Sequence, residues 1–331
     1  MTALPVADSH NDLLLAVRHL RERGHDDPFG AVWLPQLQAG GVRVQVLPVC
    51  TEEQFVGEGA LRRALLMIEE ARILADRHSD AVAIVETAAD LNDALEGGRI
   101  ALVLAIEGAE PVGHSLELLA TFYRAGVRMA SLSWNRRTMM ADGIAESDTG
   151  GRLTSLGADA VRFMQQLGMI VDVSHLSKAG FHHLVEVSER PFVASHSSCD
   201  AVHAHPRNLD DDQLRAIAAA DGLVCVNAFG PFLAEDAEID DYLRHVEHAI
   251  GVVGTTRVGF GTDFIEDVAE TVDPIFTGLL IAPGDIPHTR GLRRPADFVA
   301  LTTRLSERVG SELARAVAFE NLTAFLRREL P

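Results

Sequence analysis

Eight short apolar runs recur along the 331 residues, and stretches with helical periodicity separate them. The runs cover residues 6–9, 43–48, 101–106, 128–133, 169–173, 192–195, 223–227 and 258–262. Apolar residues repeat every three to four positions between them, over residues 58–77, 115–124, 155–167, 177–187, 210–220 and 236–253. Buried strands that alternate with amphipathic helices predict a parallel sheet with right-handed crossovers, and eight repeats match a closed (β/α)₈ TIM barrel.

Two segments fall outside these eight repeats. The short run at residues 81–86 is one more than the eight strands of such a barrel, so we expect it to form a strand outside the barrel. The tail at residues 295–330 reads as two helices that are broken near Gly310. A doubly wound open sheet is the competing fold, but it would not require eight strands and no GxGxxG follows the first run. We therefore predict one α/β barrel domain spanning residues 1–331, with C-terminal helices.

The net charge limits which partners the protein can bind, and the cysteines indicate the cell compartment in which it works. The net charge of −19 argues against nucleic acid or an anionic membrane as a partner. Cys50, Cys199 and Cys225 show no CxxC spacing and are odd in number, which favours a reducing compartment over a disulfide framework. The sequence shows neither a signal-peptide pattern nor an 18-residue apolar stretch, so we expect a cytoplasmic location.

Histidines and carboxylates end five of the eight runs. In barrels of this kind the active-site residues lie at the C-terminal ends of the strands. Imidazole and carboxylate groups suit zinc and related divalent ions. These strand ends therefore predict a metal site on one rim; they read Asp8-Ser9-His10-Asn11-Asp12, Ile106-Glu107-Gly108, Asp172-Val173-Ser174-His175, Ala194-Ser195-His196 and Gly261-Thr262-Asp263.

The spacing of three residues favours a pair of ions. His10 and Asp12 are two apart at a strand end, so both side chains can point to one side and chelate one ion. Two ions about 3.5–4 Å apart need a bridging carboxylate, and Glu107 is a natural bridge because Gly108 follows it. Taken singly, a strand-end histidine is commonly a structural residue and Glu107 could cap a helix. Their joint occurrence at five strand ends favours the metal site.

The same residues resemble motifs of the renal (membrane) dipeptidase family, peptidase family M19 of the metal-dependent amidohydrolase barrels. The resemblance covers nearly the whole chain, and all six motifs occur in the family's order. The matching segments are Asp8-Ser9-His10-Asn11-Asp12-Leu13, Ile106-Glu107-Gly108, Asp172-Val173-Ser174-His175, Ser195-His196-Ser197-Ser198, His205-Pro206-Arg207-Asn208-Leu209-Asp210-Asp211 and Val258-Gly259-Phe260-Gly261-Thr262-Asp263-Phe264.

The resemblance implies a role for each motif residue. It implies two divalent ions, with zinc favoured over manganese and cobalt, held by His10, Asp12 and Glu107 and by Glu107, His175 and His196. It implies that Asp263 accepts a proton from the bridging water and passes it to the leaving amine. It also implies that Arg207 binds the C-terminal carboxylate of the substrate, for which a guanidinium is well shaped.

One departure from the family pattern bears on the substrate; a second, Phe319-Glu320-Asn321-Leu322 in place of the family's GGN-L pattern, carries no functional consequence. The family carries an LTLTH pattern after the fourth strand, and its histidine contacts the substrate near the scissile carbonyl. Here the stretch reads Ser131-Leu132-Ser133-Trp134-Asn135, so Trp134 takes the place of that histidine. A tryptophan cannot carry a positive charge, so Asn135 or another donor would have to stabilise the oxyanion.

The resemblance thus implies a binuclear zinc dipeptidase that cleaves small dipeptides with a metal-activated hydroxide. It also implies tolerance of D-residues at the C-terminal position, and it is compatible with a homodimer. Trp134 keeps open an alternative, an amidohydrolase-type metal hydrolase that acts on another amide, a lactone or a β-lactam. A metal-binding or scaffold protein without catalysis would require the loss of a metal ligand or of Asp263, and all six residues are present.

Overall fold

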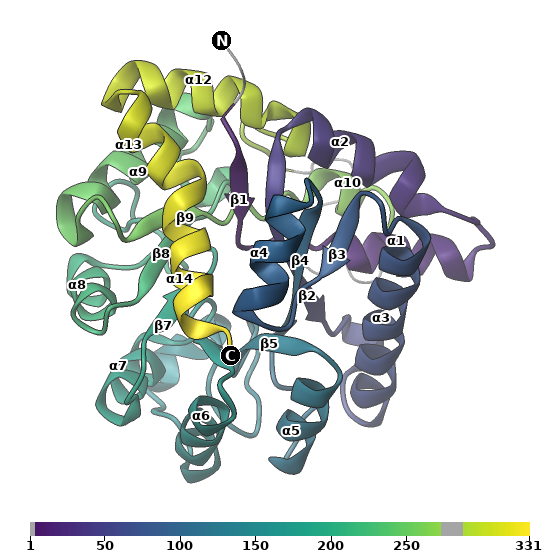
Figure 1. Cartoon of the computed structure of the whole chain (residues 1–331). Coiled ribbons are helices and arrows are strands. Elements are labelled where there is room, and N and C mark those ends of the chain that lie inside the picture. Colours follow the sequence, from purple (N-terminus) through teal and green to yellow (C-terminus); the bar gives the residue numbers. More distant parts are fainter. Residues whose placement is uncertain (1–3, 273–286) are drawn as a thin grey trace.

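Eight parallel strands close into a barrel in the computed structural model, which describes residues 4–272 and 287–331. The order around the ring is β2-β1-β9-β8-β7-β6-β5-β4, and β4 pairs with β2 to close it (Figure 1). The strands are β1 (Val6–Asp8), β2 (Val42–Cys50), β4 (Ile100–Glu107), β5 (Val127–Ser131), β6 (Ile170–Asp172), β7 (Phe192–Ala194), β8 (Leu223–Val226) and β9 (Val258–Phe260). Each overlaps one predicted run, so the predicted TIM barrel is confirmed.

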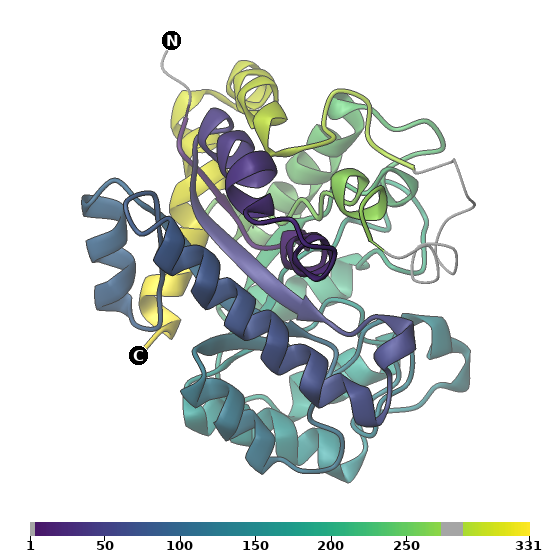
Figure 2. The same cartoon turned by 90° about the vertical axis from the view of Figure 1, so that its right-hand side faces the viewer.

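Helices surround the barrel: those before β9 lie in the connections between strands, and those from α10 onward follow the last strand (Figures 1 and 2). They are α1 (Leu13–Glu22), α2 (Leu34–Ala39), α3 (Glu58–Arg77), α4 (Ala88–Glu96), α5 (Glu117–Arg124), α6 (Ser155–Leu167), α7 (Lys178–Val187), α8 (Asp211–Ala219), α9 (Ile239–Val253), α10 (Glu266–Ala269), α12 (Phe298–Val309), α13 (Ser311–Arg315) and α14 (Asn321–Glu329). The six predicted helical stretches coincide with α3 and α5 to α9. Within the two described ranges, no helix is long and apolar enough to cross a bilayer.

The extra strand predicted near residues 81–86 lies outside the ring. It is β3 (Val82–Ile84), which pairs in parallel with residues 100–102 at the start of β4. The C-terminal tail breaks where predicted: α12 ends at Val309, and Gly310 follows with φ 84°, a backbone conformation that favours glycine.

The barrel interior is a separate apolar layer with its own closing helix. Alternate residues of β2 and β4, such as Val44, Val46 and Val103, point inward and belong to one buried cluster. Leu322 and Phe325 of α14 belong to the same cluster, and α14 lies across the strands in Figure 1. Asn321, the first residue of α14, donates from Nδ2 to the carbonyl of Val258, the first residue of β9, so α14 closes the N-terminal end and leaves the opposite rim for the site.

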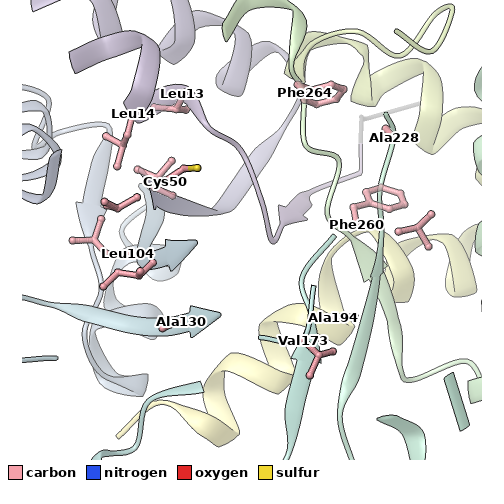
Figure 3. Packing of buried hydrophobic residues seen from close by; sticks show 14 of the residues in the cluster. Leu13, Leu14, Cys50, Leu104, Ala130, Val173, Ala194, Ala228, Phe260 and Phe264 are labelled. Atoms are coloured by element: carbon pink, nitrogen blue, oxygen red, sulfur yellow. The ribbon is translucent and has the colours of Figure 1, made fainter. Parts of the chain in front are cut away.

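A larger apolar layer lies between the strands and the surrounding helices. Leu13 and Leu14 of α1 lie on the same side of the barrel as Leu104 of β4, whereas Phe260 and Phe264 lie on the other side (Figure 3). Both layers are well buried and hold the strand ends in fixed positions.

The first and last strands of the barrel meet through a narrow seam. In register, β1 and β9 pair only at Asp8 and Phe260 among the described residues. Side chains complete the seam, because Thr262 donates its backbone N–H to Asp8 Oδ1 at 2.8 Å and Ser9 Oγ donates to the Phe260 carbonyl at 3.0 Å. The contact continues to His10, whose carbonyl accepts the backbone N–H of Asp263 at 3.1 Å.

Candidate metal centre and active site

The structure brings the predicted site residues together at the C-terminal rim of the barrel. A cavity of about 550 Å³ opens there, and Phe229, Phe232, Ile144 and Ile265 form apolar parts of its wall. The predicted residues that line it are Asp12, Glu107, Trp134, Asn135, His175, Arg207 and Asp263. His10 and His196 lie just beneath, 2% and 0% exposed.

Three imidazoles surround one oxygen of Glu107, the last residue of β4. The Nε2 atoms of His175, His196 and His10 lie 2.9, 3.3 and 3.7 Å from Glu107 Oε1. Gly108 follows with φ 86° and donates its N–H to Ser131 Oγ at 2.8 Å. The left-handed turn at this glycine lets the chain leave the strand while the carboxylate stays on the rim.

A second group of candidate metal ligands lies beside the first, and His10 belongs to both groups. The Nε2 atom of His10 lies 3.6 Å from Asp12 Oδ2 and 4.0 Å from Asp263 Oδ1. The candidate ligand atoms of His10, Asp12 and Asp263 lie within 4.8 Å of one another, and so do those of His10, Glu107 and His196. This grouping differs in detail from the two ligand sets that the resemblance implies, because Asp263 stands as close to His10 as a ligand would.

Hydrogen bonds on the far side of two rings fix their tautomers. His175 Nδ1 lies 2.8 Å from Asn135 Oδ1, which can only accept, so this nitrogen carries the proton. His196 Nδ1 lies 2.7 Å from Ser195 Oγ, whose own proton goes to Asp172 Oδ2 at 2.5 Å. Both Nε2 atoms therefore present a lone pair to Glu107, which is the tautomer that metal-binding histidines adopt.

Burial sets the protonation states of the metal-free site. It lowers the pKa of both His175 and His196 well below the usual range, so both rings are neutral. Burial, together with the nearby Asp12, raises the pKa of Glu107 to about 8. Burial alone would lower the pKa of His10, but the carboxylates of Glu107, Asp12 and Asp263 raise it to about 10.

This donor set fits divalent ions of the zinc type. Among the described residues, His10 Nε2 and Asp12 Oδ1 are buried atoms without a hydrogen-bond partner. Buried polar atoms are normally paired, and two unpaired ligand-type atoms on residues two apart at the rim are what a metal site requires. Neutral imidazoles and carboxylates are the ligand types that such ions prefer.

Asp263 is held at the rim by a residue that the sequence analysis missed. Asn227, which follows β8, donates from Nδ2 to Asp263 Oδ2 at 3.0 Å, and Asp263 itself has φ 53°. Burial raises the pKa of Asp263 to about 6. Asn227 ends the seventh apolar run, so the rule that selected the other strand ends could have found it.

Arg207 is a buried cation without an acidic partner in contact. It is 5% exposed, and it donates from Nη1 to Ser197 Oγ at 2.8 Å and from Nη2 to the His196 carbonyl at 2.9 Å. Across residues 4–272 and 287–331, its Nε has no hydrogen-bond partner and no carboxylate forms an ion pair with it. Burial lowers its pKa to about 10, so it stays charged at neutral pH and favours an anion in the cavity.

Trp134 and Asn135 occupy the rim after β5. The Arg136 guanidinium lies 4.9 Å from the centroid of the Trp134 ring and is anchored by Glu110, at 2.7 Å, and by Glu53. Trp134 thus forms a fixed wall of the cavity. The oxygen of Asn135 is engaged with His175, so this side chain orients a ring in addition to lining the cavity.

Residues 1–275 match the sequence profile of the membrane dipeptidase family, peptidase family M19. The chain belongs to this family. It is therefore a metal-dependent peptidase of the dipeptidase class, as the six sequence motifs had predicted.

Two relatives illustrate the breadth of the M19 family. Dipeptidase aclJ of Aspergillus oryzae is 29% identical over 305 residues, which cover 83% of this chain and 72% of the relative. An uncharacterised dipeptidase of Schizosaccharomyces pombe is 30% identical over 307 residues, which cover 82% of this chain and 74% of the relative.

Solved M19 structures share the fold over the full length. The dipeptidase AC, a metallopeptidase of family M19, matches with a TM-score of 0.86 and 27% identity over 99% of both chains. A metallopeptidase from Rhodobacter sphaeroides, with a phosphinate mimic of the dipeptide L-Ala-D-Ala bound, matches with a TM-score of 0.85 and 25% identity over 99% of this chain and 100% of that chain.

Proposed function

We propose that this M19 member is a binuclear dipeptidase, with zinc as its preferred ion. The observation that carries the proposal is the convergence of three imidazole nitrogens on one oxygen of Glu107, with a second donor group beside it that shares His10. Two adjacent donor groups around a buried carboxylate are what a pair of ions with a shared bridge requires.

The residues would divide between the two ions as the family motifs suggest. His10, Asp12 and Glu107 would hold one ion, and Glu107, His175 and His196 would hold the other. When bound, such ions supply Lewis acidity, which polarises a carbonyl group and favours the ionisation of water near neutral pH.

The chain's own groups would then bind the substrate and move one proton. Arg207 would hold the C-terminal carboxylate, which would exclude substrates that have a further residue in its place. Asp263, oriented by Asn227, would take a proton from the attacking water and pass it to the leaving amine. Its raised pKa of about 6 in the metal-free site suits a group that must both accept and release a proton.

A D-residue at the C-terminal position of the substrate forms part of this proposal. It is supported by the Rhodobacter sphaeroides relative, whose bound ligand mimics L-Ala-D-Ala. Comparable hydrolysis of L-Ala-D-Ala and L-Ala-L-Ala would support it, and hydrolysis of the L,L-dipeptide alone would contradict it.

The decisive experiment is the hydrolysis of a dipeptide panel by protein stripped with a chelator and by the same protein reloaded with zinc. We expect cleavage that disappears on stripping and returns with two zinc ions per chain, as measured by elemental analysis. Reloading with manganese or cobalt tests the preference for zinc. A fully reloaded protein that cleaves no dipeptide would contradict the proposal.

Trp134 favours a second candidate function within the same chemistry. It stands where the family pattern has a histidine near the scissile carbonyl, and Arg136 fixes its ring there. The metal site would then hydrolyse another amide, a lactone or a β-lactam. Turnover of such a substrate by reloaded protein that leaves every dipeptide intact would select this function.

A further inference from the structure

Two phenylalanines after β8 present their rings to the cavity. Phe229 precedes the short 3₁₀ helix η4 (Gly230–Phe232), and Phe232 ends it. Their ring centroids are 4.8 Å apart in an edge-to-face arrangement, and both side chains line the cavity and are only half-buried. Large apolar side chains left partly open inside a concave site are typical of a surface that an apolar ligand group covers.

This aromatic surface lies next to the cation that would hold the substrate's carboxylate. The Arg207 guanidinium carbon is 5.8 Å from the centroid of the Phe232 ring, and the His205 ring also packs against Phe232, at 4.6 Å between ring centroids. In a dipeptide the C-terminal side chain starts on the carbon that bears the carboxylate. A carboxylate bound by Arg207 therefore brings that side chain to the Phe232 side of the cavity.

We infer that the enzyme selects substrates whose C-terminal residue carries a large apolar side chain, and that Phe229 and Phe232 determine this selectivity. The inference rests on the proposed function, because it needs Arg207 to hold the C-terminal carboxylate.

Size and chemistry of the cavity agree with this inference. About 550 Å³ is within the usual range for sites that enclose a drug-sized ligand, so a phenylalanyl or leucyl group fits. A charged C-terminal side chain would lose water against two phenyl rings without gaining a partner from them, which disfavours it.

The first test uses the zinc-loaded wild-type protein and the series Ala-Gly, Ala-Ala, Ala-Leu, Ala-Phe and Ala-Asp, with L-residues. We expect kcat/KM for Ala-Leu and Ala-Phe to exceed that for Ala-Ala by about ten-fold or more, and Ala-Asp to be the poorest. If the dipeptides are cleaved but kcat/KM for Ala-Leu and Ala-Phe equals or falls below that for Ala-Ala, the inference is overturned and the proposed function remains intact. If no dipeptide is cleaved, the proposed function itself fails.

The second test asks whether the two rings cause the selectivity. Phe232→Ala and Phe229→Ala should reduce the ratio of kcat/KM for Ala-Phe over Ala-Ala, whereas Phe232→Leu should keep most of it. Phe163→Ala is the matched control, because Phe163 is also half-buried but lies on α6 and does not line the cavity. An unchanged ratio in both alanine variants, with melting temperatures near that of the wild type, would overturn the assignment to these rings.

Discussion

The Nδ1 atom of His175 lies 2.8 Å from Oδ1 of Asn135, and this bond decides which nitrogen of the ring faces Glu107. His175 also has φ 68°, so its backbone is held in a conformation that non-glycine residues rarely adopt. Asn135 thus compensates in part for local strain and keeps the ring ready to bind an ion.

Removing this partner should weaken metal binding. Asn135→Ala is expected to lower zinc affinity by about 10- to 100-fold, because the His175 ring loses both its tautomer and its orientation. Competition with a chromogenic chelator measures the affinity. Asn135→Asp keeps an oxygen that accepts the hydrogen bond, so it should retain most of the zinc affinity. Asn92→Ala on α4 is the control and should leave the zinc affinity unchanged. Wild-type affinity in Asn135→Ala would contradict the role.

Asp263→Asn separates proton transfer from metal binding. The amide can still pair with Asn227 but cannot accept the proton, so kcat should fall by at least about 100-fold. Elemental analysis should still find two zinc ions per chain. Full activity would refute proton transfer by Asp263, and loss of one ion would place Asp263 among the ligands, where its 4.0 Å distance from His10 makes it a candidate.

Arg207 should discriminate between a dipeptide and its C-terminal amide. Arg207→Met is expected to lower kcat/KM for dipeptides by about 100-fold, since a buried charge-assisted pair is lost. The preference for the free carboxylate over the amide should vanish in the same variant. Arg152→Met, which removes an exposed arginine that pairs with Glu186, serves as control. A preference that survives in Arg207→Met would show that another group binds the carboxylate.

The stability of the metal-free protein should fall as the pH rises from about 7 to about 9. Burial raises the pKa of Glu107 to about 8, and the neighbouring carboxylates raise that of His10 to about 10, above the usual values of 4.5 and 6.5. In this interval the folded state holds protons that the unfolded chain has released, so raising the pH favours unfolding.

Bound ions replace those protons, so zinc-loaded protein should show a smaller slope. Urea midpoints at several pH values, with chelator and with zinc, measure the difference. Parallel slopes for the two forms would contradict this account of the site.

Arg136→Met should destabilise the fold by about 3 kcal/mol, because it leaves the buried Glu110 carboxylate without its partner. Adding Glu110→Gln should restore part of the loss. Arg152→Met is the control: its side chain and that of its partner Glu186 are 54% and 60% exposed, and its loss should cost less than about 1 kcal/mol. Denaturation in urea measures each value. Equal effects of Arg136→Met and Arg152→Met on the free energy of unfolding would show that the buried pair with Glu110 stabilises the fold no more than an exposed ion pair does.

The barrel and most of the rim could be predicted because both depend on periodicity. Each buried strand appears as a short apolar run, and the polar residue that ends it must lie on the common rim of a parallel barrel. Glu107 is an example: it ends an apolar run in the sequence and ends β4 in the structure.

The remaining features depend on loop conformation, which leaves no periodic trace. The left-handed backbone at His175 and Asp263 could not be predicted, because histidine and aspartate adopt it more often than most residues but still rarely. The approach of Asn135 to His175 joins loops after β5 and β6, and the position of Phe232 beside Arg207 joins loops after β7 and β8. Such contacts follow from the packed structure, since neither partner predicts the other.

The narrow seam between β1 and β9 has a consequence for how the protein matures. His10 and Asp263 approach to 4.0 Å only when that seam closes, although 253 positions separate them along the chain. A nascent chain that still lacks its last strand therefore has the five proposed metal ligands but not Asp263, however well its earlier strands have paired. The group proposed to transfer the proton thus reaches the site only when the ring has been completed, so catalytic competence should be gained late in biogenesis.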